Sequence, residues 1–420
     1  MSEAENLDRD EPISFGCPRM VGEARLPAYD RLRSEAPVYK DPLTGNYVLT
    51  RYKDVRSTLL NHRQFKTDAG LVGGNRKSPV KAEVEAIYLA KGPLPGRNLQ
   101  TYDPPEHRQH RAPIDRAFDH WKLEALRGFI EEQANFLVDG FIERGEVEFV
   151  SEFTIPFPLR VFADQLGLGM EDASLLKLWA DVGVEDIDPT LPPDRQVEAA
   201  HVMAGMNEYL QKAIANARAH PGDRLISKLV ETIDPEGTQA GLIEIMAVLR
   251  AIIIAAGDTT TFGLGGGMRL LMGNPHLVPV IRDDRDKLLA FVEEALRIVS
   301  PLQTLFRCAA EDVAIGGVTI PKGAIIEARY GAGDLDPEVF PCPYQVDLER
   351  ENVRSHVVFG VAPHICPGML LARTEMEIAF KVMTQRMDNF RPARGADSYE
   401  YSTSYIAHGP VRAHIAFDRR

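Results

Sequence analysis

The chain has few cysteines, and their spacing suggests no pairing. Four occur in 420 residues, and no two form a Cys-x-x-Cys pair. A disulfide framework is therefore not expected, and the composition favours a reducing compartment. The four are Cys17, Cys308, Cys342 and Cys366.

Signals for secretion and for membrane insertion are also missing. The segment Met1 to Glu11 is acidic and polar, without the basic and apolar regions of a signal peptide. The richest apolar run is interrupted by Arg250, Asp258 and Arg269, and it falls short of the roughly 20 residues that span a bilayer. We therefore expect a soluble, cytoplasmic protein with no membrane partner.

Positive charge is scarce. The chain has 48 Lys and Arg against 61 Asp and Glu, and a net charge of −13 disfavours nucleic acid as a partner. Repeats and low-complexity tracts are absent. With 44% apolar and 26% charged residues this is an ordinary globular composition, and length alone allows two or three domains.

One cysteine stands in a distinctive setting. Cys366 ends a turn-rich loop that begins at Phe359, and a helix follows it directly. Gly360 and Gly368 bracket it and permit close backbone approaches that a side chain would forbid. Such a loop suits a thiolate held against a metal, above all heme iron, although a lone cysteine is more commonly a buried structural residue.

Periodicity predicts the helix after Cys366. Apolar residues recur at three- and four-residue steps, and Pro367 suits a first helical turn, where its missing N–H costs nothing. The helix N-terminus then points at the sulfur, so its free N–H groups are expected to stabilise a thiolate. The periodic residues are Met369, Ala372, Met376, Ala379, Met383 and Met387.

This loop resembles the heme-binding loop of the cytochrome P450 superfamily, whose pattern is Phe-Gly-x-Gly-x-His/Arg-x-Cys-x-Gly. One position departs, because Ala362 replaces the second glycine. The resemblance implies heme b as cofactor, with Cys366 as the ligand of its iron. The matching residues, expected to bind the cofactor, are Phe359, Gly360, His364, Cys366 and Gly368.

A second segment, Glu294-Ala295-Leu296-Arg297, matches the Glu-x-x-Arg motif of the family. Residues three apart share a helix face, so the acid and the base can pair, although an ordinary surface ion pair has the same spacing. Arg350 resembles the family's meander arginine. The resemblance implies a buried structural cluster of Glu294, Arg297 and Arg350, in which losing one partner leaves a costly unpaired charge.

A third segment places Asp258 and Thr259 in an apolar helical run. Burying a carboxylate and a hydroxyl without partners costs several kcal/mol, so they need a reason to be there. The segment resembles the family's distal helix, which implies that Asp258 and Thr259 relay protons to iron-bound dioxygen. The alternative is a threonine bonded to its own backbone and an acid facing solvent.

Cationic side chains suit the carboxylates of the expected cofactor. His107 and Arg111 lie four apart after the turn at Asp103, hence on one helix face. The resemblance implies that they hold the heme propionates together with Arg307 and His364. A solvated basic helix is the alternative for the first pair.

The family resemblance implies a mainly α fold with small β-sheets (α+β), a single-domain triangular prism with heme between the distal helix and the Cys-ligand helix. We expect a flexible N-terminal segment, 1–22, and one heme-thiolate monooxygenase domain, 23–420. Within it lie a lid at 66–100, a distal helix at about 238–270 and the heme-binding loop at 359–368.

The implied activity is hydroxylation of an apolar small molecule with O2. A terpenoid, a steroid or a small aromatic compound fits equally well. Each residue expected in the pocket could also be plain core. The expected pocket residues are Ala251, Ile254, Ala255, Leu302, Leu305, Tyr405 and Ile406.

Electrons are expected from outside the chain, because it carries no flavin or ferredoxin segment of its own. By resemblance the donor is an acidic iron–sulfur ferredoxin with its reductase, acting on a monomeric enzyme. Basic residues around the two proximal segments are expected to form a docking patch: Arg108, Arg111, Arg116, Arg373 and Lys381.

Two rival functions remain open. A peroxide-dependent heme-thiolate peroxygenase would usually lack the Asp258-Thr259 pair, and a non-enzymatic heme-binding sensor would need no proton relay. The run Gly263 to Gly267 does not fit a dinucleotide-binding motif, because Met268 stands where the last glycine should be and no strand precedes the run.

Overall fold

The computed structural model describes residues 13–15, 17, 20, 22–67, 78–94, 96–119, 123–188, 191–361 and 363–420. Ala362 lies outside the described residues, as do most of the expected N-terminal segment 1–22 and part of the expected lid 66–100.

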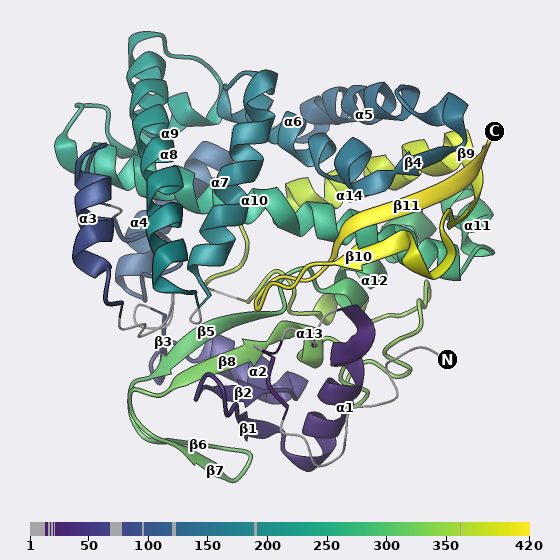
Figure 1. Cartoon of the computed structure of the whole chain (residues 1–420), viewed down its shortest axis with the longest axis horizontal. Helices are drawn as coiled ribbons and strands as arrows, with labels where there is room; N and C mark the ends of the chain where they lie inside the picture. Colours follow the sequence, from purple (N-terminus) through teal and green to yellow (C-terminus); the bar gives the residue numbers. More distant parts are fainter. Residues whose placement is uncertain are drawn as a thin grey trace.

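The molecule is mainly helical, with small sheets packed against the helices (Figure 1). The helices in the first half of the chain are α1 (Arg25–Glu35), α2 (Tyr52–Leu60), α3 (Lys81–Leu89), α4 (Glu106–Asp119), α5 (Leu123–Asp139), α6 (Pro156–Leu166), α7 (Ala173–Asp186) and α8 (Pro193–Ala219). Those in the second half are α9 (Leu225–Ile233), α10 (Gln239–Gly273), α11 (Leu277–Asp283), α12 (Arg285–Val299), α13 (Tyr330–Gly333) and α14 (Met369–Arg386).

One sheet has the order β1-β2-β8-β5-β3 and lies below the helical layer in Figure 1. Its strands are β1 (Val38–Lys40), β2 (Tyr47–Leu49), β3 (Phe65–Lys66), β5 (Thr304–Ala309) and β8 (Ile325–Arg329). A second sheet joins β4 (Glu146–Glu148), β9 (Met387–Pro392), β10 (Tyr399–Tyr401) and β11 (Pro410–Arg419). The strands β6 (Val313–Ile315) and β7 (Val318–Ile320) form a separate hairpin.

The helix α10 organises the core. Its N-cap residue Thr238 accepts a hydrogen bond from the Gly241 N–H, which satisfies one of the free donors at the helix start. From there α10 crosses the helical layer and contacts α6, α7, α8, α9, α12 and α14 (Figure 1). Its first half contributes Leu249 to one large apolar cluster and its second half contributes Leu264 to another.

The glycine run Gly263–Gly267 has a packing role. A Cβ on Gly266 would lie 2.6 Å from a methyl of Val299, and a Cβ on Gly267 would lie 2.7 Å from the ring of Phe380. The absence of side chains therefore lets α12 and α14 approach α10 directly. This close approach holds the distal helix against the helix that follows Cys366.

The helix α10 is also long and apolar enough to cross a membrane, contrary to the expectation from its interrupting charges. In this fold it is a core helix, because α7, α12 and α14 pack directly on it. Tertiary packing thus accounts for its apolar composition.

Candidate heme-thiolate site

A large cavity opens between α10 and α14. Cys366 and Gly368 line one side and Ala251 and Thr259 line another, and the space between the lining residues measures about 1740 Å³, part of it open to solvent. The cavity therefore lies between the predicted iron ligand and the predicted distal helix.

The loop before α14 presents Cys366 to this cavity. Gly360 has a φ of +70°, a left-handed conformation that glycine adopts readily, and its N–H donates to the carbonyl of Val357. The Cys366 N–H then donates to the carbonyl of Phe359 at 2.8 Å, which closes the loop. Gly368 precedes the first residue of α14, so the sulfur faces the helix N-terminus as the sequence predicts.

The pKa of the Cys366 thiol differs from the expectation that the helix N-terminus stabilises a thiolate. Burial raises the pKa of the thiol above its ordinary value, while the N–H groups of Gly368 and Met369 and the charges of Arg111 and Arg373 oppose the rise. The helix terminus thus favours the thiolate but does not outweigh burial by itself. A bound cation would supply the remaining stabilisation, because metal coordination deprotonates a thiol outright.

Two histidines meet beside the cavity, and they have ring nitrogens without hydrogen-bond partners among the described residues. His107 on α4 is 1% exposed and both of its ring nitrogens lack a partner, as does Nε2 of the partly exposed His364. The two ring centroids lie 4.4 Å apart. Burial, together with neighbouring cations, lowers the pKa of both rings, that of His364 to about 3. Buried polar groups are nearly always paired, so these donors await an acceptor.

The two arginines predicted to join them also line the cavity. Arg307 is 4% exposed, and no carboxylate among the described residues pairs with it. Arg111 donates from Nη1 to the carbonyl of Ile365 and from Nε to Asp115 at 2.6 Å. The structure therefore brings together all four predicted propionate donors, and they suit a cofactor that carries carboxylates.

The donor set around the cavity fits heme b. One thiolate, four donors for carboxylates and apolar walls are what that cofactor would require. Among the described residues no group of three or more His, Cys, Asp or Glu side chains could hold a metal ion.

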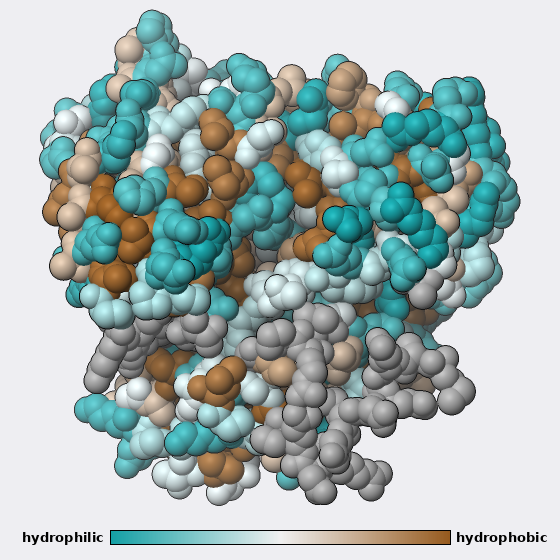
Figure 2. Space-filling model, viewed as in Figure 1, coloured by the Kyte–Doolittle hydropathy of each residue, from teal (hydrophilic) through white to brown (hydrophobic). Residues whose placement is uncertain are grey.

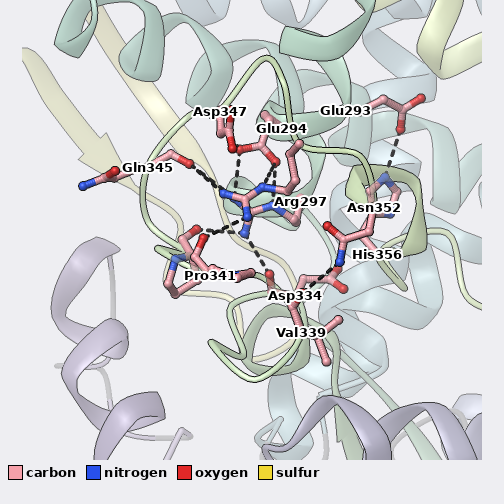
Figure 3. Close-up of polar contacts among 12 residues, drawn as sticks. Glu293, Glu294, Arg297, Asp334, Val339, Pro341, Gln345, Asp347, Asn352 and His356 are labelled. Atoms are coloured by element: carbon pink, nitrogen blue, oxygen red, sulfur yellow. Dashed lines mark hydrogen bonds and ion pairs between the residues drawn. The ribbon is translucent and has the colours of Figure 1, made fainter.

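Below the cavity, Glu294 joins two arginines in a buried cluster (Figure 3). Its Oε1 accepts from Arg297 Nε at 2.8 Å and from Arg350 Nε at 2.9 Å, and Glu294 and Arg297 are both fully buried. Arg297 also donates to the carbonyls of Asp334 and Pro343. The cluster ties α12 to the segment that leads to the Cys366 loop.

On α10 the predicted proton-relay pair faces two directions. Thr259 lines the cavity, and its hydroxyl donates to the carbonyl of Ala255 at 2.9 Å. Asp258 does not line it, and its Oδ1 lies 3.0 Å from Nζ of Lys177 on α7. Thr259 therefore bonds its own helix, as the alternative to a relay supposed, although it also lines the cavity. Asp258 is 7% exposed and ion-paired, so it does not face solvent as that alternative supposed.

A carboxyl group that the sequence did not predict lines the cavity. Glu375 on α14 is 3% exposed, and no cation among the described residues forms an ion pair with it. Burial raises its pKa to about 8, and a hydrogen bond with Thr260 opposes the rise only in part. Glu375 is therefore a neutral acid near pH 7. The sequence signal that could have predicted this burial is the position of Glu375 among apolar residues that recur at helical spacing.

Four of the seven predicted pocket residues line the cavity, namely Ala251, Ala255, Leu302 and Leu305. The other three do not line it. Ile254 packs where a Cβ on Gly183 would stand, so it faces α7. Tyr405 donates a hydrogen bond to Glu327, and Ile406 lies with it in a separate core cluster.

The remaining walls of the cavity are apolar. Phe162 of α6 and Val248 and Ile252 of α10 line the cavity and were not predicted from the sequence. Leu99 lines it from the expected lid. On the face shown in Figure 2, apolar surface gathers over the α3 side of the molecule, where Leu89 is 61% exposed.

The expected basic patch is smaller than predicted. Arg111, Arg373 and Lys381 pair with Asp115, Glu293 and Glu131 respectively. Arg108 and Arg116 are exposed on α4, and neither forms an ion pair with a described residue. Beside them the side chains of Ile365 and Leu370 are exposed near Cys366, at 37% and 58%.

Known proteins share both the sequence pattern and the fold. The family model described as Cytochrome P450 matches residues 282–393. Cytochrome P450 107B1 of Saccharopolyspora erythraea is 31% identical over 394 residues, which are 91% of this chain and 94% of that protein. Vitamin D(3) 25-hydroxylase of Pseudonocardia autotrophica is 30% identical, with 94% of each chain covered. The structure of cytochrome P450 CYP109Q5 from Chondromyces apiculatus matches with a TM-score of 0.82 at 25% identity, covering 97% of this chain and 98% of that one.

Proposed function

The chain belongs to the cytochrome P450 family and is a monooxygenase of that family, and on this premise we propose that it hydroxylates an apolar small molecule at a heme bound through Cys366. The observation that carries the proposal is the meeting, at one cavity, of Cys366 with the unpartnered nitrogens of His107 and His364. A thiolate and free donors for carboxylates are needed together only by a cofactor that has both a metal and acidic arms.

Heme, when bound, supplies one-electron redox chemistry and the activation of O2. Cys366 would bind its iron, and Phe359 and Gly368 would lie beside that ligand. His107, Arg111, Arg307 and His364 would hold its propionates. The fully buried pair of Glu294 and Arg297, with Arg350, keeps the segment below Cys366 in place.

The proton path that we propose begins at the surface between α7 and α10. The Lys177 side chain is 20% exposed and is paired with Asp258. Asp258 precedes Thr259, whose hydroxyl lies at the cavity wall. A proton accepted at the Asp258 carboxylate would pass to the Thr259 hydroxyl once that group turns from the Ala255 carbonyl. These two residues are the proposed catalytic groups.

The proposed substrate is uncharged and mostly apolar. The walls opposite Cys366 are aliphatic and aromatic, among them Ala251, Leu302 and Phe162. An ionised substrate would lose its hydration there without gaining a partner. A terpenoid, a steroid or a small aromatic compound meets this requirement, and a relative named as a hydroxylase of vitamin D(3) supports hydroxylation as the reaction.

Electrons in this proposal come from an external ferredoxin and its reductase. The exposed cations Arg108 and Arg116 lie on the same helix as His107, so an acidic protein would be drawn toward the cofactor site. We further propose that residues 23–420 form one heme-thiolate domain of a cytoplasmic, monomeric enzyme, without contact to nucleic acid or membrane.

The visible spectrum of the purified protein, reduced and exposed to carbon monoxide, tests the proposal. A strongly red-shifted Soret band is expected, it should be lost in Cys366→Ser, and it should persist in the control Cys342→Ser, where the cysteine is exposed. An imidazole-like band in folded protein, or no heme uptake at all, would overturn the ligand assignment.

Turnover separates the proposal from its two rivals. A peroxygenase would form product with hydrogen peroxide alone and gain nothing from the ferredoxin system. A heme-binding sensor would show the thiolate band without oxidising any apolar compound that shifts its spectrum. Product formed only with O2 and the electron donor supports the monooxygenase.

A further inference from the structure

Glu293 and Glu294 are neighbours on α12 but serve different partners. Successive helical residues point about 100° apart, since a turn takes 3.6 residues. Figure 3 accordingly shows Glu294 toward Arg297 and Glu293 toward His356. Glu294 belongs to the structural cluster described above, whereas the contacts of Glu293 lead to the Cys366 loop.

Glu293 is a buried carboxylate with several cationic donors. It is 3% exposed, and Arg373 of α14 donates hydrogen bonds to it from Nε at 2.7 Å and from Nη2 at 3.0 Å. His356 adds its Nε2 at 3.0 Å, and Arg354 approaches to 3.5 Å from a largely exposed position. Burial alone would raise the pKa of Glu293, but the bonds from His356 and Arg373 lower it to about 2. Glu293 is therefore ionised at all physiological pH values.

The Arg373 side chain connects this carboxylate to the loop. Its guanidinium lies over the Phe359 ring at 4.6 Å from the centroid, a cation–π contact, and the His356 ring lies 5.9 Å from the same ring. The Phe359 carbonyl in turn accepts the Cys366 N–H. The Arg373 charge also reaches the Cys366 thiol, where it acts against the effect of burial.

We propose that Glu293 is a positioning residue that holds the Arg373 charge beside the Cys366 loop, and that this charge helps to set the reduction potential of the bound heme. The inference rests on the proposed binding of heme through Cys366. A fixed cation near a metal ligand stabilises the form with one more electron, and charges and hydrogen bonds around the ligand are known to tune such sites.

The step concerned is a one-electron reduction. One electron from the external donor converts ferric iron to ferrous iron, and no bond or proton changes at Glu293 or Arg373. Removing the cation should therefore make the potential more negative, and removing the carboxylate should make it more positive. Shifts of opposite sign in the reduction potential distinguish an electrostatic role from loosened packing, because loosened packing would shift the potential of both variants in the same direction.

The test is spectroelectrochemical titration of the heme-loaded protein. We expect a negative shift in Arg373→Gln, a much smaller one in Arg373→Lys, which keeps the charge, and a positive shift in Glu293→Gln. Glu377 offers a matched control, because it is 4% exposed and pairs with Arg127 and Arg285 instead. Glu377→Gln should leave the potential unchanged.

Shifts of one sign in Arg373→Gln and Glu293→Gln, or equal shifts in Arg373→Lys and Arg373→Gln, would overturn the inference. If Glu293→Gln does not fold, the two Arg373 variants still decide. The proposed function fails separately, through absence of the thiolate band in the unmodified protein after carbon monoxide treatment.

Discussion

Nζ of Lys177 lies 3.0 Å from Oδ1 of Asp258 across the contact between α7 and α10, and the same ammonium group also binds Asp181. Burial would lower the pKa of Lys177, but its two carboxylates outweigh this and raise it. Lys177 is thus a cation that holds the Asp258 carboxylate in an ion pair. The Lys177 side chain is the more exposed partner and borders solvent.

This arrangement gives a matched pair of variants. Asp258→Asn should lower the turnover rate by roughly a hundredfold, the lower range for loss of a general acid or base, and should enlarge the solvent isotope effect. Asp181→Asn removes a carboxylate from the same lysine but leaves α10 intact, so its turnover should stay close to that of the unmodified enzyme. Equal losses in both variants would show that the rate depends on the ion pairs of Lys177 and not on a proton relay at Asp258.

Thr259→Ala should uncouple electron flow from product formation. Electrons should still be consumed, but product per electron should fall by roughly tenfold or more, with hydrogen peroxide in its place, because the hydroxyl at the cavity is gone. Thr261→Ala is the control, since the Thr261 hydroxyl donates to the carbonyl of Thr154 away from the cavity. Unchanged coupling in Thr259→Ala would make Thr259 an ordinary helix residue.

His107→Phe should weaken heme retention by roughly tenfold or more, the usual cost of losing a supporting contact at a metal site. Transfer of heme to apomyoglobin measures the loss rate. The control is His110→Phe on the same helix, where the histidine stacks on Tyr102 and pairs with Glu244. Equal loss rates in both variants would argue that His107 does not bind a propionate.

The raised pKa of Glu375 predicts that the free energy of unfolding depends on pH. Its folded pKa of about 8 exceeds the ordinary value of 4.5, so between these values the unfolded chain releases a proton that the folded chain keeps. The stabilising contribution is complete below 4.5 and is lost as pH rises toward 8, by about 1.4 kcal/mol per unit at most.

Urea unfolding of the heme-loaded protein at both ends of this interval measures the effect. Glu375→Gln, which cannot ionise, should lose less stability on raising the pH than the unmodified protein does. Glu377→Gln should not flatten the profile in this way, because its ion pairs with Arg127 and Arg285 lower the pKa of Glu377. Parallel profiles for the unmodified protein and Glu375→Gln would contradict the assignment.

Reversing the charges of Arg108 and Arg116 to Glu should slow the first reduction by a ferredoxin by roughly tenfold at low ionic strength, and the difference should shrink as salt is added. The double reversal of Lys40 and Lys322, exposed beside the β1–β2 and β7–β8 connections, changes the net charge equally and serves as control. A rate that is unaffected in the Arg108 and Arg116 variant places the docking surface elsewhere.

Local patterns predicted the parts of the site that depend on neighbours in sequence. The helix after Cys366 follows from the periodicity of its apolar residues, and it is confirmed. The spacing of Glu294 and Arg297 likewise fixes their common helix face before any folding is considered. Such features involve residues a few positions apart, where backbone geometry leaves little choice.

Contacts between distant segments were not predictable in this way. Tyr405 was expected at the substrate from the family resemblance of the C-terminal turn, but its hydroxyl donates to the buried Glu327, 78 residues away. Ile254 was expected there from the resemblance of the distal helix, yet its side chain packs toward α7. The partner of Asp258 comes from another helix, 81 residues away.

The sequence by itself determined the family and the local form of the loop around Cys366, because a short loop with two glycines before a helix admits few structures. Only the tertiary structure decided which faces of α10 and α14 border the cavity. It also decided that Glu375 is buried neutral while Glu377 is ionised, and that Arg373 is held by Glu293. Burial and pairing set the charge of a side chain, and both depend on helices that meet only when the whole chain has folded.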